Sequence, residues 1–182
     1  MKLTTKDMVY IAISTTILVL CSFITIPFYV PFTLQTFALF TIIGLFGTKR
    51  SFFSVCLYLL LGAIGLPVFS GFQSGLGTLF GVTGGYLFGF LLACLVSGLL
   101  LFCFKKNNKK IVKHFFASIA GLLVCYLFGT LWYLLLYTNS TGSISLTSVL
   151  SLCVFPFILP DIIKILLSAY VVKLLKKHIA GS

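Results

Sequence analysis

The fold of this chain is decided by residues 51–104, which have the sequence SFFSVCLYLLLGAIGLPVFSGFQSGLGTLFGVTGGYLFGFLLACLVSGLLLFCF. These 54 residues contain no Asp, Glu, Lys or Arg. A helix needs about 20 residues to cross the hydrocarbon core of a bilayer, so the segment is long enough for two crossings with about 14 residues left over. The Gly-rich run 65–77 matches that excess. The segment therefore predicts two transmembrane helices joined by a loop.

The composition of the whole chain agrees with this interpretation. Of its 182 residues, 60% are hydrophobic and 8% are charged, whereas a typical soluble domain has roughly 25% charged residues. The six cysteines form no CxxC pair, the two histidines lie far apart, and no GxxxxGK[ST] motif occurs. These patterns predict no metal site and no P-loop. They argue against a soluble enzyme, a disulfide-rich secreted domain and a nucleic-acid-binding protein.

Two further apolar regions complete the count of helices. The 41 residues between Asp7 and Lys49 carry no formal charge, and the region from His114 to Val172 is divided by the polar turn 138–145. Each region is long enough for two crossings. We therefore expect an all-α integral membrane protein, with one domain over residues 1–182 and an outer loop at 66–81. The six predicted helices span about residues 8–26, 33–48, 51–66, 82–104, 114–137 and 147–173.

The basic residues predict the orientation of this domain. The chain has 13 Lys and Arg residues and two acids, a net charge of +11. Twelve of the basic residues flank the predicted helices on one side of the membrane, which by the positive-inside rule is the cytoplasm. Both termini are then cytoplasmic, in a multi-pass protein of the cell membrane. A cleaved signal peptide over residues 1–21 is the alternative, although no A-x-A-like cleavage site follows.

Asp161 and Lys164 are the strongest candidates for a binding site. Lys164 is the one basic residue outside the cytoplasmic clusters, and a spacing of three residues puts both side chains on one helix face. Ionisable groups in a bilayer are costly and usually face the bundle interior or a cavity. The alternative is structural: the pair locks the last helix to a neighbour, or Asp161 caps a helix that restarts at Pro160.

Two other stretches carry polar or small residues. The run 30–36, VPFTLQT, brings Gln35 to the start of the second predicted helix, where Thr33 or Thr36 could alternatively act as a helix cap. Glycines recur every fourth residue at positions 77, 81, 85 and 89. Such a stripe allows close helix packing. The run 71–75, GFQSG, could form a lid or a pocket wall.

Four motifs of the chain resemble those of a known family, the biotin-specific substrate-binding (S) component of energy-coupling factor (ECF) transporters. They occur in family order over about residues 5–175: VPFTLQT at 30–36, YLLLGAIGLPVF at 58–69, GLGTLFGVTGGYLFGF at 75–90, and PDIIK at 160–164. The sequence departs from the family pattern at Val82, where a proline is expected, and between Pro160 and Asp161, where one residue is missing.

The resemblance implies a six-helix S component that captures biotin from outside with high affinity and is not itself an enzyme. It implies no cofactor, and it implies three partner subunits: a transmembrane coupling subunit and two ABC-type ATPases. Small residues on the first helix would dock the coupling subunit; here they are Ala12 and Thr16, a weakened version of the family motif. The implied substrate-binding residues are Asp161, Lys164, Gln35, Thr33, Gln73, Thr83, Gly84, Gly85 and Tyr86.

The sequence is also compatible with three other functions. S components share one fold across substrates, so another vitamin is the nearest alternative. A channel or a non-transport membrane scaffold is a second alternative. A membrane enzyme is a third, although Asp7 and Asp161 are the only acids available for acid–base or metal chemistry.

Overall fold

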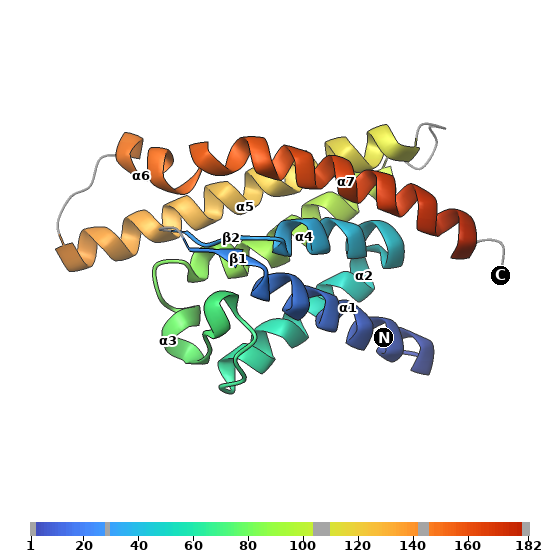
Figure 1. The fold of residues 1–182 in the computed structure, drawn as a ribbon, viewed down its shortest axis with the longest axis horizontal. Helices are drawn as coiled ribbons and strands as arrows, with labels where there is room; N and C mark the ends of the chain where they lie inside the picture. The colour runs from blue at the N-terminus through green and yellow to red at the C-terminus, as the bar shows by residue number, and fades with distance from the viewer. Residues whose placement is uncertain (1–2, 28–29, 104–109, 142–145, 180–182) are drawn as a thin grey trace.

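The computed structural model of the chain describes residues 3–27, 30–103, 110–141 and 146–179. Within these residues the chain is almost entirely helical, and Figure 1 shows an elongated bundle. Five of the helices, α1, α2, α4, α5 and α7, are long and apolar enough to cross a membrane. The expected all-α membrane fold is therefore confirmed. The elements are α1 (Thr5–Phe23), β1 (Thr25–Ile26), β2 (Phe32–Thr33), α2 (Gln35–Ala63), the 3-10 turn η1 (Ser70–Phe72), α3 (Gly75–Leu79), α4 (Gly84–Cys103), α5 (Lys110–Thr141), α6 (Leu146–Cys153) and α7 (Phe155–Ile179).

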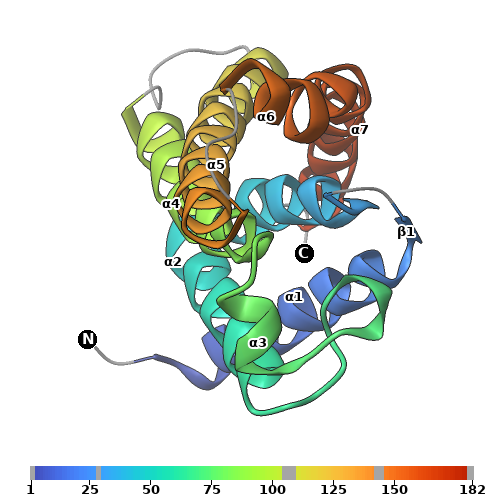
Figure 2. The ribbon, with the colours of Figure 1, turned by 90° about the vertical axis from the view of Figure 1, so that its left-hand side faces the viewer.

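Helix α2 consists of two parts that meet at Gly47. This glycine has φ 81° and ψ 167°, which is not helical. A positive φ is accessible to glycine because it has no Cβ. Figures 1 and 2 show that the part after Gly47 leaves the axis of the part before it. The two parts correspond to the segments predicted at 33–48 and 51–66, and the turn lies two residues before the predicted junction at Lys49 and Arg50.

The start of α1 is tied to the second part of α2. Thr4 and Asp7 form a capping box, in which each side chain accepts a hydrogen bond from the other residue's backbone N–H. The Asp7 carboxylate also contacts the Arg50 guanidinium at 2.6 Å, and the guanidinium lies 4.7 Å from the centre of the Tyr10 ring. Helix α1 therefore begins at Thr5 rather than at the predicted residue 8, because Thr4 supplies the cap.

Two segments differ from the prediction: one predicted loop contains short helices, and one predicted helix is divided in two. The loop predicted at 66–81 contains η1 and α3, and its Val68 carbonyl accepts a hydrogen bond from the Ser22 hydroxyl of α1 at 2.6 Å. The helix predicted at 147–173 is divided into α6 and α7 at Val154. Pro156 contributes to the second difference, because it lies in the first turn of α7 and has no N–H to donate to the carbonyl of Leu152 in α6.

Glycines bring α4 and α5 into close contact. A Cβ built on Gly85 would lie 2.3 Å from the Trp132 Cβ, and one built on Gly89 would lie 2.9 Å from the Cys125 sulfur. Gly77 belongs to the same four-residue repeat, but a Cβ on it would meet nothing within 4 Å. In the second half of the repeat, Gly85 and Gly89 therefore allow the helices to pack closely. At Gly77 there is free space beside the backbone.

We expect Gly85→Ala to destabilise the protein by about 1–3 kcal/mol, because the added methyl group overfills the α4–α5 contact. Gly77→Ala is the matched control, since it adds the same methyl group where there is space. Thermal unfolding of both variants in detergent measures the effect. Equal melting temperatures for the two variants would contradict the close contact between α4 and Trp132.

Candidate functional site

The bundle encloses a cavity of about 700 Å³, a volume that includes its open mouth. Most of its wall is apolar or aromatic, and its polar groups come from separate segments of the chain. The lining residues are Val30, Pro31, Thr33, Gln35, Thr36, Phe69, Ser70, Thr78, Thr83, Tyr86, Leu87, Phe90, Leu122, Cys125, Tyr126, Cys153, Phe157, Asp161 and Lys164.

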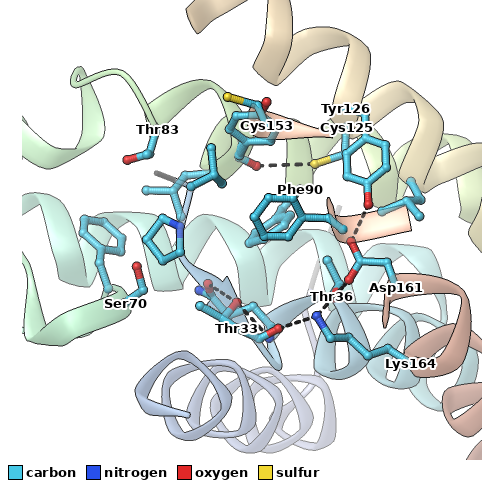
Figure 3. Close-up of a pocket in the computed structure, with 18 of the residues that line it drawn as sticks. Thr33, Thr36, Ser70, Thr83, Phe90, Cys125, Tyr126, Cys153, Asp161 and Lys164 are labelled. Atoms are coloured by element: carbon cyan, nitrogen blue, oxygen red, sulfur yellow. Dashed lines mark hydrogen bonds and ion pairs between the residues drawn. The ribbon is translucent and has the colours of Figure 1, made fainter. Parts of the chain in front are cut away.

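A buried ion pair forms the polar end of this cavity. Asp161 and Lys164 lie one turn apart on α7, and the Lys164 Nζ is 2.8 Å from the Asp161 Oδ1. The two residues are only 3% and 5% exposed. The Asp161 carboxylate also accepts hydrogen bonds from the hydroxyls of Thr36, at 3.0 Å, and Tyr126, at 2.6 Å. Figure 3 shows these groups converging from α2, α5 and α7.

The ammonium group of Lys164 has two further partners. It donates a hydrogen bond to the Thr33 carbonyl at 2.7 Å, and it lies 3.8 Å from the centre of the Phe32 ring. The pair therefore connects α7 to β2 and to the start of α2, as the structural alternative expects. Asp161 lies inside α7, and its side chain does not cap the helix. Because the same two residues also line the cavity, locking the helix and binding a ligand are compatible roles.

Gln35 is held by hydrogen bonds at both ends of its amide. Its Oε1 accepts a bond from the Thr33 hydroxyl at 2.9 Å, and its Nε2 donates to the Tyr58 hydroxyl at 2.6 Å. The Thr33 hydroxyl accepts from the Gln35 backbone N–H at 3.2 Å, which satisfies one donor at the start of α2. Thr36 instead points to Asp161. Thr33 and Gln35 thus combine a local structural role with a position in the cavity wall.

The remaining predicted residues divide into two groups. Thr83 and Tyr86 line the cavity, and the Tyr86 hydroxyl lies 3.5 Å from that of Thr130. Gln73, Gly84 and Gly85 are not among the lining residues. Gln73 is exposed, and its carbonyl accepts a hydrogen bond from the Phe69 N–H. A Cβ on Gly84 would meet the Leu79 carbonyl oxygen, as one on Gly85 would meet Trp132, so both glycines allow close backbone packing.

Several lining residues were missed by the sequence reasoning. The most important is Tyr126, which contacts Asp161 directly. Phe90 forms part of the apolar wall, and the buried side chains of Cys125 and Cys153 also reach the cavity. No signal in the sequence separates these residues from the other aromatic and cysteine residues of the chain, because their role depends on which helix faces meet.

The chemistry of the cavity favours the binding of a small ligand. Its opposite charges compensate each other, and its polar groups can donate and accept hydrogen bonds beside aromatic surfaces that fit a small apolar ring. Within the residues that the structure describes, no three His, Cys, Asp or Glu side chains are grouped so that they could hold a metal ion. Ala12 and Thr16 lie away from this cavity, on an exposed face of α1, where the Thr16 hydroxyl donates to the Ala12 carbonyl.

Comparisons with known proteins give the family. Residues 1–181 match the BioY family. The biotin transporter BioY of Thermotoga maritima is 35% identical over 173 residues, which cover 94% of this chain and 96% of that protein. The biotin transporter BioY2 of Lactococcus lactis subsp. cremoris is 40% identical over 159 residues, which cover 86% and 82%.

A solved structure has the same fold. It is the crystal structure of the S-component for biotin from an ECF-type ABC transporter, with a TM-score of 0.83 and 27% sequence identity. The match covers 97% of this chain and 95% of that one. The family match and the similarity to these relatives extend over nearly the whole chain. The chain is therefore a multi-pass membrane protein that belongs to the BioY family.

Proposed function

We propose that this chain captures biotin with high affinity and takes it up across the cell membrane, as the S component of an ECF-type ABC transporter. The observation that carries the proposal is the cavity, in which a buried Asp161–Lys164 pair faces an aromatic wall. The relatives named as biotin transporters support biotin as the ligand. The solved S-component for biotin supports this type of transporter.

The groups of biotin suit the cavity. Biotin has a ureido group with two N–H donors and a carbonyl acceptor, an apolar ring that contains sulfur, and a carboxylate tail. Asp161 can accept from a ureido N–H, and Lys164 can donate to the ureido carbonyl or to the carboxylate. The rings of Phe69, Tyr86 and Phe90 can cover the apolar ring. Thr33 and Thr83 offer further polar contacts at the wall.

We also propose roles at the substrate site for the rest of the predicted set. Gln35 would act mainly by holding Thr33 in place, because both ends of its amide are engaged. Gly84 and Gly85 would shape the wall by bringing α4 close to α3 and α5. Gln73, which follows η1 in the exposed loop, would contact biotin only when that loop closes over the cavity.

Neutralising either member of the pair should weaken biotin binding. Asp161→Asn removes the charge and Lys164→Met removes the donors, and each should cost about 1.5–3 kcal/mol of binding free energy, or ten- to hundredfold in Kd, since charged hydrogen bonds are lost. Equilibrium binding of labelled biotin to the purified variants measures this loss. Thermal unfolding of the same samples reports any effect on folding.

The double variant and a distant control separate binding from folding. In the double variant no charge is left unpaired, so it should regain stability but not biotin binding. Asp7→Asn removes a carboxylate from the other ion pair that the structure describes, outside the cavity lining, and should leave Kd unchanged. A stable double variant that binds biotin as tightly as the wild type would exclude the pair from the binding site.

We further propose that the domain crosses the membrane six times, with both termini in the cytoplasm. The division of α2 at Gly47 supports six crossings, since each part is a separate helical segment. In Figure 1 the start of α1, the bend within α2, the start of α5 and the end of α7 lie toward one end of the bundle, and α3 lies toward the other. This arrangement agrees with a basic cytoplasmic side.

Cysteine labelling in intact cells tests the topology, on a background without the six native cysteines. Cysteines at Lys2, Lys49, Lys109 and Lys177 should react only after permeabilisation, and those at Gln73 and Asn139 should react in intact cells. Lys2 and Lys109 lie outside the described residues, as do the side chains of Asn139 and Lys177. Labelling of position 73 only after permeabilisation would contradict six crossings.

We propose that the energy for uptake comes from partner subunits. The sequence has no GxxxxGK[ST] motif to bind ATP. A transmembrane coupling subunit and two ABC-type ATPases would supply it, and the coupling subunit would dock on the α1 face that carries Ala12 and Thr16. That face is exposed, as docking requires.

Co-expression with such a module should yield a complex that accumulates biotin in vesicles supplied with ATP. Ala12→Trp and Thr16→Trp should reduce co-purification of the coupling subunit, because a bulky ring prevents close helix approach. Both variants should keep the wild-type Kd for biotin, since neither residue lines the cavity. Uphill accumulation by vesicles that contain this chain alone would show that no energising partner is required.

A further inference from the structure

The hydroxyl of Tyr126 occupies one side of the Asp161 carboxylate. It donates to Oδ2 at 2.6 Å, whereas Lys164 and Thr36 donate to Oδ1 at 2.8 Å and 3.0 Å. A carboxylate has about four positions at which it can accept hydrogen bonds, two on each oxygen. Three of them are therefore occupied by the protein, and the fourth lies on Oδ2, beside Tyr126.

We propose that Tyr126 is a specificity-determining residue of this pocket. By occupying one position on Oδ2, its hydroxyl leaves Asp161 able to accept a single N–H from a ligand. The pocket then selects a neutral head group, such as a cyclic urea, over a cationic head group that presents two parallel N–H donors. The inference rests on the proposed function, because it takes biotin as the ligand.

The arrangement of donors around the Asp161 carboxylate supports this selection. A guanidinium group binds a carboxylate best through two parallel N–H···O bonds, one to each oxygen. Here Oδ1 already accepts from Lys164 and Thr36, so both donors of a guanidinium would have to reach Oδ2, where Tyr126 leaves only one position. The Lys164 ammonium also neutralises Asp161 and would repel a second cation placed next to it. A neutral N–H needs only the one vacant position.

The position of the Tyr126 ring makes a single-atom test possible. Figure 3 shows Tyr126 directed toward Asp161, and the residue lines the cavity next to Cys125 on α5. Tyr126→Phe keeps the aromatic ring in the wall and removes only the hydroxyl. Oδ2 then has two vacant positions, so it becomes able to accept the pair of donors that the wild-type protein excludes.

The experiment compares the affinities of two probes. Biotin carries the neutral ureido group, and 2-iminobiotin carries a guanidinium group in its place and is cationic at neutral pH. For Tyr126→Phe, the ratio of the 2-iminobiotin Kd to the biotin Kd should fall at least about tenfold, because a hydrogen bond to a charged group is gained for one ligand only. Tyr126→Met, which also lacks the hydroxyl, should lower the ratio in the same direction.

Tyr170→Phe is the matched control. It removes the same hydroxyl from an exposed tyrosine on α7 that does not line the cavity, so both Kd values should stay at the wild-type level. If Tyr126 only supports the fold, Tyr126→Phe will weaken both ligands by the same factor, and an unchanged ratio overturns the inference. A wild-type protein that does not bind biotin overturns the proposed function itself and, with it, this inference.

Discussion

A charged side chain inside an apolar bundle must have partners, and this constraint organises the structure around Asp161 and Lys164. Leaving either group alone would cost several kcal/mol, so the surrounding segments supply compensating contacts. Thr36 approaches from α2, Tyr126 from α5, and the Thr33 carbonyl from β2. Two parts of the chain that are distant from α7 in sequence, residues 33–36 and α5, therefore meet at one point of α7. The cavity is the space that remains beside this junction.

Close helix contacts at two glycines, and a loop held to α1, form the rest of the cavity wall. Gly85 and Gly89 allow α4 to approach Trp132 and Cys125 of α5, and Tyr86 and Phe90 of α4 form part of the cavity wall. The loop that contains η1 is held to α1 through Ser22, and its Phe69 ring is only 1% exposed. The wall is thus assembled from close backbone contacts, whereas the polar end depends on hydrogen bonds.

The sequence predicted those features that depend on neighbouring residues or on long composition patterns. The apolar runs predicted the helical membrane fold, and the spacing of Asp161 and Lys164 predicted a pair on one helix face. Tyr126 could not be predicted, because its importance comes from the way α5 faces α7 and the chain has 28 Phe and Tyr residues. The division at Val154 depends on local backbone geometry, and the turn at Gly47 was expected two residues later.

The pairing of Asp161 with Lys164 also determines how the polar end of the cavity responds to a transmembrane voltage. Moving one elementary charge through 100 mV involves about 2.3 kcal/mol. The two side chains have opposite charges whose atoms lie 2.8 Å apart, so together they carry no net charge through the field when α7 moves. The pair itself therefore adds no net gating charge to binding at this site, whereas a charged ligand would add its own.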